Sequence, residues 1–165
     1  FADNGLRGSK WTLYEGGVRV PWLVRWPGKV PAGESCDIPV IGMDILPTLC
    51  ALAGATVPAD RLIDGENLLP LFTQTASALG RDTLTWHFPF YHPWHVGTTP
   101  VSSMRRGPWK LLYFYEDGRT ELYDLTADPL EQHDLSAERA SEAAALREVL
   151  LEQLRDAGAR FPQRR

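Results

Sequence analysis

Three short β-type runs and the helical pattern that follows them constrain the fold of this chain more than any other feature. The runs are bounded by Gly, Pro and Asp residues and cover residues 101–105, 109–115 and 120–124. The last two are separated by a segment that contains Asp117-Gly118, a strong signal for a tight hairpin turn. Residues 83–88 form a fourth run of the same kind. The sequence therefore predicts an antiparallel sheet of about four strands.

A long helix is expected directly after this sheet. Ser136 is the predicted N-cap and Gly158 the predicted stop. Apolar residues recur between them at helical spacing, at Ala143, Leu146, Leu150, Leu154 and Ala157. An apolar stripe of this kind is buried when the helix packs on another element. We therefore expect residues 81–165 to form a C-terminal subdomain, an antiparallel sheet with a long helix packed on one face.

The first half of the chain has too few strand signals for a sheet of its own. Residues 22–26 are predicted to form a strand and residues 38–42 a short second one. A helix capped by Asp44 and a helical turn at residues 68–72 follow. A strand without neighbours leaves backbone groups unpaired. We therefore expect residues 1–80 to be the incomplete end of an α/β domain, and a homo-oligomer could form through the unpaired strand.

Composition is typical of a globular chain and gives no sign of a nucleic-acid partner or of a membrane span. The 165 residues are 44% hydrophobic and 23% charged, with a formal net charge of −4. Nucleic acids are bound by clustered Lys and Arg, so no nucleic-acid partner is expected. No apolar run approaches the ~20 residues of a membrane helix, so no membrane span is expected. A signal peptide would lie upstream, and localisation stays open between periplasm, exterior and cytoplasm.

Two neighbouring segments near the N-terminus carry side chains suited to chemistry. Asp3 and Asn4 offer carboxylate and amide oxygens, which suit a hard divalent cation. The alternative is a purely structural Asp-Asn-Gly turn. Lys10 follows in a glycine-containing loop, where an ammonium could bind an anionic oxygen as a point charge. The alternative for Lys10 is a solvated surface side chain, and the residues alone leave these alternatives open.

Both segments belong to a series of motifs that resembles the sulfatases of the alkaline phosphatase superfamily. The motifs are residues 3–28 with their Tyr-Glu-Gly-Gly turn, residues 39–54, Asp64-Gly65 with residues 68–71, residues 86–89, residues 106–111, residues 121–125, Asp128-Pro129 and Glu131. They cover nearly the whole chain in the order that the family has. The resemblance implies an α/β, alkaline-phosphatase-like fold, of which this chain would be the C-terminal part, with residues 1–80 ending the catalytic domain. It also implies hydrolysis of sulfate esters.

The resemblance implies a role for individual residues. Asp3 and Asn4 would be ligands of the family's divalent cation, usually Ca²⁺. Lys10 would contact the sulfate group and stabilise charge on the leaving oxygen. Candidates for the substrate side, with structural packing as the alternative, are His87, His92 and His95. The substrate of the intact enzyme would be a sulfated small molecule or carbohydrate.

The nucleophile of the family is missing from this sequence. It is a formylglycine made from Cys or Ser in a Cys/Ser-x-Pro-x-Arg motif, and neither Cys36 nor Cys50 is followed by that pattern. We therefore expect the formylglycine upstream, and we expect the chain alone to be inactive. Two alternatives remain. One is a phosphate mono- or diester hydrolase of the same superfamily, because phosphate and sulfate are both tetrahedral oxyanions. The other is a non-catalytic structural or binding module.

Overall fold

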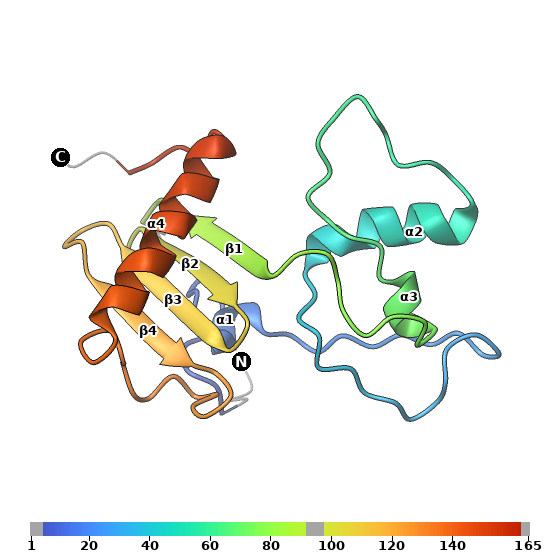
Figure 1. The fold of residues 1–165 in the computed structure, drawn as a ribbon, viewed down its shortest axis with the longest axis horizontal. Coiled ribbons are helices and arrows are strands. Elements are labelled where there is room, and N and C mark those ends of the chain that lie inside the picture. The colour runs from blue at the N-terminus through green and yellow to red at the C-terminus, as the bar shows by residue number, and fades with distance from the viewer. Residues whose placement is uncertain (1–4, 92–97, 163–165) are drawn as a thin grey trace. The chain divides into compact units, whose positions relative to one another are not determined.

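The chain divides into two compact units. The computed structural model describes residues 5–91 and 98–162. One unit, here called the sheet unit, combines Phe1–Pro21 with Thr83–Arg165, and the other, the helical unit, is Trp22–Asp82 (Figure 1). The described residues 5–21 therefore belong to the same unit as the C-terminal sheet. How the complete protein divides into domains near residue 80 stays a prediction.

A four-stranded antiparallel sheet forms the centre of the sheet unit. Its strands lie in chain order and are β1 (Thr83–Phe88), β2 (Val101–Arg106), β3 (Trp109–Phe114) and β4 (Thr120–Asp124). The β3–β4 hairpin turns at Gly118, whose φ of 74° is a conformation that favours glycine. The predicted sheet of about four strands is confirmed.

Helix α4 (Ala140–Asp156) covers one face of this sheet (Figure 1). Side chains alternate between the two faces along a strand, and Leu111 and Leu122 point toward the helix. There they pack with Leu146 and Leu150 in one buried cluster. The long helix is confirmed as the cover of one sheet face. Four members of the predicted stripe are buried there, namely Ala143, Leu146, Leu150 and Leu154, whereas Ala157 lies at the C-cap and is exposed.

Helix α4 begins later than the sequence predicts. Ser136, the predicted N-cap, lies in a turn, where its N–H donates to Asp134 Oδ1 at 2.8 Å. The same carboxylate oxygen accepts the N–H of Leu122 in β4 at 3.0 Å. Because Asp134 ties this turn to the edge strand, the chain passes through further turn residues before the helix begins at Ala140. The predicted N-cap was therefore wrong.

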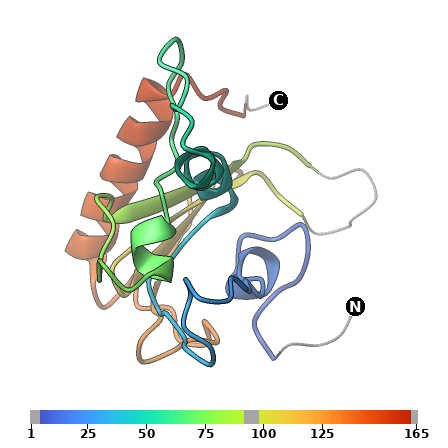
Figure 2. The same ribbon diagram turned by 90° about the vertical axis from the view of Figure 1, so that its right-hand side faces the viewer.

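The N-terminal segment covers the opposite face of the sheet. Leu13 and Tyr14 pack against a second buried cluster that includes Leu112 and Tyr123. The segment then forms the short helix α1 (Glu15–Val18). Figure 2 shows α1 and α4 on opposite sides of the sheet. Both faces of the sheet are thus covered by the chain itself.

The helical unit contains two helices and a 3₁₀ turn. They are α2 (Ile45–Ala53), which ends at Gly54, the single-turn α3 (Leu69–Phe72), and the 3₁₀ turn Gly42–Asp44 that precedes α2. The sequence predicted both helices at these places. Among the described residues, no helix of the chain combines the length and apolarity needed to cross a membrane.

Neither of the strands predicted for the helical unit forms. Residues 22–82 are all described, and none of them is in a strand. Residues 22–26 have no neighbouring strand with which to build a ladder of hydrogen bonds. At residues 38–42 the cause is local, because Asp44 Oδ2 accepts the N–H of Ile41 at 2.9 Å and the chain turns into the 3₁₀ helix.

A buried carboxylate connects distant parts of the helical unit. Asp44 is fully buried and makes no side-chain cap for α2, contrary to the prediction. It accepts the N–H groups of Ile41 and Glu66, both at 2.9 Å, and binds both terminal nitrogens of Arg81. Burial alone would raise the pKa of Asp44, but these hydrogen bonds, led by Arg81, outweigh burial and lower it. Asp44 therefore links three separate segments of the helical unit, at residues 41, 66 and 81, instead of capping α2.

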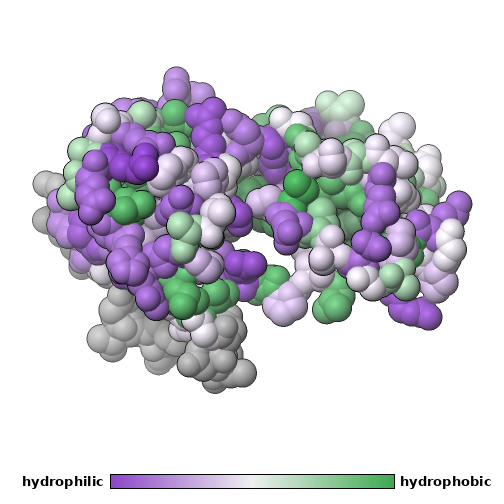
Figure 3. Space-filling model, turned by 60° about the horizontal axis from the view of Figure 1, so that its bottom comes forward, coloured by the Kyte–Doolittle hydropathy of each residue, from purple (hydrophilic) through white to green (hydrophobic). Residues whose placement is uncertain are grey.

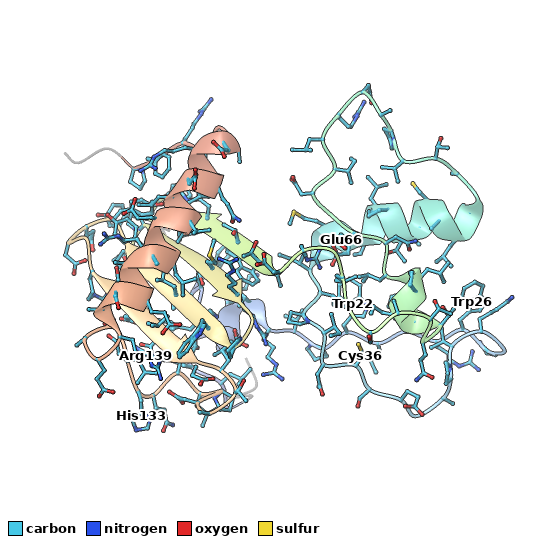
Figure 4. The ribbon with its side chains drawn as sticks, in the orientation of Figure 1. Trp22, Trp26, Cys36, Glu66, His133 and Arg139 are labelled. Carbon is cyan, nitrogen blue, oxygen red and sulfur yellow. The ribbon has the colours of Figure 1, made fainter. Side chains whose placement is uncertain are left out.

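Large apolar side chains are exposed on the helical unit. Those of α2 are between 39% and 55% exposed: Ile45, Leu46, Leu49 and Leu52. In the extended segment, Trp22 and Trp26, labelled in Figure 4, are 39% and 37% exposed, and Leu23 between them is 92% exposed. Figure 3 shows hydrophobic surface over this unit. Apolar surface of this extent is typical of a face that another part of a protein covers.

Candidate active-site loop

Of the predicted site residues, the structure describes Lys10 and His87. The other four lie outside the described residues: Asp3, Asn4, His92 and His95. Within the described ranges, no group of three or more His, Cys, Asp and Glu side chains is arranged to hold a metal ion. The cation ligands and the two later histidines therefore stay predictions.

Lys10 lies at the exposed tip of a loop that closes on itself, residues 7–17, here called the Lys10 loop. The loop is closed by the N–H of Gly16, which donates to the carbonyl of Arg7 at 2.8 Å. The ammonium of Lys10 lies 4.9 Å from the ring centroid of Trp11, within range of a cation–π interaction. The loop thus presents a cation to solvent on a backbone held by its own hydrogen bonds.

Two glycines allow the Lys10 loop to close this tightly. A Cβ at Gly16 would lie 2.5 Å from the carbonyl oxygen of Gly8, and a Cβ at Gly17 would lie 2.0 Å from that of Thr12. Neither distance is possible for a real side chain. The glycines of the Tyr-Glu-Gly-Gly turn are therefore required by close approach of the backbone.

Three charged side chains are buried between the Lys10 loop and the sheet. Lys110 Nζ, on β3, lies 2.7 Å from Glu15 Oε1 and 3.2 Å from Glu131 Oε1. It also lies 6.0 Å from the ring centroid of Trp86. Burial raises the pKa of Glu131, and the attraction of Lys110 opposes this shift. Buried charges are tolerated only when they are paired, and here the pairing joins Glu15 of α1 to Lys110 of the sheet.

Arg7 makes a second connection between the loop and the sheet. Its Nη1 donates to the hydroxyl oxygen of Tyr123 and to the carbonyl oxygen of Glu131, both at 2.7 Å. The Tyr123 hydroxyl in turn donates to Glu121 Oε2 at 2.7 Å. Burial raises the pKa of Tyr123 to about 12, against the opposing charge of Arg7. The phenol therefore keeps the proton that this hydrogen bond needs at neutral pH.

His87 packs inside the sheet unit with both ring nitrogens engaged. Nδ1 lies 2.6 Å from Ser102 Oγ, and Nε2 lies 2.9 Å from the carbonyl oxygen of Arg160. A carbonyl can only accept, so we assign the proton to Nε2, and Nδ1 accepts from the Ser102 hydroxyl. The rings of Tyr115 and Phe161 meet the imidazole edge to face. The role of His87 on the substrate side stays a prediction.

Sequence analysis missed Arg7, Lys110 and Glu131 as parts of this site. One signal was available for Lys110. It is the second residue of β3, a strand whose other residues are mostly apolar, where Lys is rarely buried unless it has a partner. Nothing local identifies Glu131 as that partner, because it follows β4 in an irregular segment.

Comparison with known protein families shows the family to which the chain belongs. The family model described as N-sulphoglucosamine sulphohydrolase, C-terminal, matches residues 8–159. The chain belongs to this sulfatase family. It is a C-terminal portion of a sulfatase, as the motifs from the Lys10 loop to Glu131 indicated.

Individual proteins agree with this assignment. The chain is 33% identical over 162 residues to a steryl-sulfatase of Rattus norvegicus, covering 82% of this chain and 28% of that protein. A solved structure in complex with its substrate D-glucosamine-2-N,6-O-disulfate is 28% identical, with a TM-score of 0.67, over 79% of this chain and 27% of that one. The chain thus spans less than a third of both.

The fold extends beyond sulfatases. A phosphonate monoester hydrolase from Silicibacter pomeroyi has a TM-score of 0.61 and 22% identity, over 80% of this chain and 28% of that one. At that identity the likeness shows the fold alone. The predicted fold class, the C-terminal part of an α/β, alkaline-phosphatase-like fold, is confirmed by the solved structures that the chain matches.

Proposed function

We propose that the complete protein containing this chain hydrolyses sulfate esters, and that Lys10 contacts the sulfate group. The observation that carries this proposal is the Lys10 loop itself. The ammonium of Lys10 is exposed at the tip of the loop. Near the ends of the loop, Arg7 and Glu15 are hydrogen-bonded to residues that lie beyond β3, namely Tyr123 and Glu131. A cation held in advance stabilises charge that develops on an oxygen without reorganising during the reaction.

The proposed substrate is a sulfated small molecule or carbohydrate. The similarity to a steryl-sulfatase and to a protein solved with a disulfated glucosamine supports both classes. Phosphate ester hydrolysis is the alternative, because a phosphonate monoester hydrolase shares the fold. The family match over residues 8–159 favours sulfate.

We further propose that Asp3 and Asn4 are ligands of a divalent cation, Ca²⁺ in keeping with the family. A carboxylate and an amide oxygen fit such an ion, which takes roughly six to eight oxygen ligands. Most of its ligands would therefore come from parts of the complete protein outside this chain, as would the formylglycine nucleophile. The cation, when bound, would polarise the sulfate oxygens of the ester.

Replacing Lys10 tests the proposal. In the complete protein, Lys10→Ala should lower kcat/KM for 4-nitrophenyl sulfate by about 100-fold, the usual effect of losing one preorganised partner of a charged oxygen. Lys29→Ala removes another exposed lysine, in the helical unit, and should leave kcat/KM within about twofold. A Lys10→Ala enzyme within a few-fold of the wild type would contradict the proposed role.

Two further assays separate the alternatives. The complete protein should prefer 4-nitrophenyl sulfate to 4-nitrophenyl phosphate, and the opposite preference would favour the phosphate ester hydrolase. The 165-residue chain, purified alone with Ca²⁺ added, should show no turnover above background because it contains no nucleophile motif. Metal-dependent turnover by this chain would mean that its site is complete.

A further inference from the structure

One residue binds the Lys10 loop near both of its ends. The carbonyl oxygen of Glu131 accepts Nη1 of Arg7 at 2.7 Å, at the start of the loop. The carboxylate Oε2 of Glu131 accepts the backbone N–H of Glu15 at 2.7 Å, close to its end. The two contacts span 124 and 116 residues of sequence. A single residue of the C-terminal segment therefore binds both sides of the loop that carries Lys10, in addition to the hydrogen bond from the Gly16 N–H to the Arg7 carbonyl.

The backbone of Glu131 has an unusual conformation for this task. Its φ is 55°, in the left-handed region that few residues other than glycine adopt. Strain of this kind persists only where the surroundings impose it, and it gathers at functional sites. Glu131 is also fully buried. In this conformation both its backbone carbonyl and its carboxylate reach the loop. Gly and Asn, the common residues at such a φ, have no carboxylate that could make the second contact.

Lys110 holds the Glu131 carboxylate in place. Glu131 Oε1 makes no hydrogen bond to any described residue, yet it lies 3.2 Å from Lys110 Nζ. The same ammonium binds Glu15 at 2.7 Å. With solvent excluded, attraction to one ammonium keeps the two carboxylates together despite their like charges. The cluster therefore joins β3, α1 and the segment after β4.

We propose that Glu131 is a positioning residue for Lys10. It acts through Glu15 and Arg7 and does not touch the substrate, and this inference rests on the proposed role of Lys10 at the sulfate. Without the Glu131 carboxylate, the N–H of Glu15 loses its acceptor, and this end of the loop keeps only the ion pair of Glu15 with Lys110 and the hydrogen bond of Gly16 with Arg7. Lys10 then samples more positions. A small displacement of a catalytic group is costly to the rate, because that group must lie in place at the moment of reaction.

Hydrogen exchange on the 165-residue chain tests the positioning directly. Glu131→Ala should speed exchange of the Glu15 and Gly16 amides by about tenfold or more, while the β3 amides stay protected. Asp134→Ala is the matched control. It removes a carboxylate of the same connecting segment that binds the N–H groups of Leu122 and Ser136 but not the loop. Equal effects of the two variants on the loop amides would overturn the proposal.

Kinetics of the complete protein test the consequence for catalysis. With 4-nitrophenyl sulfate, Glu131→Ala should lower kcat by about tenfold and leave KM within about twofold. In a Lys10→Ala background it should lower kcat by less than about twofold, because both changes act through one ammonium. Asp134→Ala should not change kcat in either background. Should Glu131→Ala fail to fold, Glu131→Met, which has a similar size and no oxygen to accept the Glu15 N–H, replaces it in the same cycle.

The two proposals fail in different ways in this experiment. If Lys10→Ala has little effect on kcat/KM, the proposed function of Lys10 is wrong. If Lys10→Ala has its large effect but Glu131→Ala lowers kcat equally in both backgrounds, Glu131 acts independently of Lys10. That second result would overturn the positioning role and leave the proposed function intact.

Discussion

The sheet unit and the helical unit differ in what covers their apolar side chains. In the sheet unit, α4 covers one face of the sheet and the N-terminal segment covers the other (Figure 2). In the helical unit, the leucines of α2 and the side chains around Trp22 are exposed, and no strand forms. The sheet unit therefore contains its own core, whereas the helical unit contains secondary structure without enough neighbours to bury it.

The extent of the chain explains this difference. It spans 28% of the rat steryl-sulfatase it matches, and we expect the rest of the complete protein to cover the helical unit and to pair with residues 22–26. In the isolated chain, pairing of these residues with a second copy is the alternative. In both cases we expect the helical unit to be well ordered only when a partner covers it. The sheet unit should be well ordered by itself.

The largest expected contrast between the units is in hydrogen exchange. The amides of Trp109–Phe114 lie in a strand paired on both sides, and in a monomeric chain they should exchange at least about 1000-fold more slowly than those of Trp22–Trp26. Exchange measured by NMR, with light scattering to establish the monomer, checks this. Equal protection of the two segments in a monomer would mean that the helical unit is complete by itself.

A pair of identical substitutions sharpens the comparison. Leu150 in α4 is fully buried, and Leu49 in α2 is 55% exposed. Leu150→Ala should lower the free energy of unfolding by about 2–5 kcal/mol, because it leaves a cavity in the core. Leu49→Ala should change it by less than about 0.5 kcal/mol in the isolated chain. Urea unfolding followed by circular dichroism measures both. A large loss from Leu49→Ala would show that α2 is packed after all.

Local patterns in the sequence predicted the sheet unit well. The bounds of Thr83–Phe88 and Thr120–Asp124 agree with the prediction, and so does the hairpin at Gly118. Strand alternation and turn chemistry act over a few residues, so a single sequence carries them. The start of α4 was missed because Asp134, which accepts the N–H groups of both Leu122 and Ser136, ties the turn at Ser136 to a strand that is distant from any local helix signal.

Contacts between distant residues were beyond such patterns. The strand predicted at residues 22–26 depends on neighbours that this chain does not supply. At the candidate site, Lys10 was proposed from the motif around it, and its role stays a prediction. The residues that hold its loop were not predicted, because they are more than 100 positions away, as the contacts of Glu131 with Arg7 and Glu15 show. No spacing rule connects such positions in a single sequence.

The smallest expected difference between the units is in their response to acid. The pKa of Asp44 in the helical unit is lowered, so its contribution to stability is complete above the ordinary value of 3.8 and is lost as pH falls through the lowered value. The pKa of Glu131 in the sheet unit is raised by burial from its ordinary value of 4.5. Its contribution is therefore complete below 4.5 and is lost as pH rises through the raised value. Acidification should weaken the contribution of Asp44 and strengthen that of Glu131.

Two backbone amides report these titrations separately. The N–H of Glu66 donates to Asp44 at 2.9 Å, and the N–H of Glu15 donates to Glu131 at 2.7 Å. In an NMR titration from about pH 7 to about pH 2, the Glu66 amide should shift with a midpoint below 3.8 and the Glu15 amide with a midpoint above 4.5. Asp44→Asn should abolish the first transition and leave the second. If the two midpoints occur in the opposite order, the buried carboxylates do not distinguish the units. The order expected here follows from the balance of burial and partners. At Asp44 the guanidinium of Arg81 and two backbone N–H groups outweigh burial, whereas at Glu131 burial outweighs the attraction of the ammonium that it shares with Glu15.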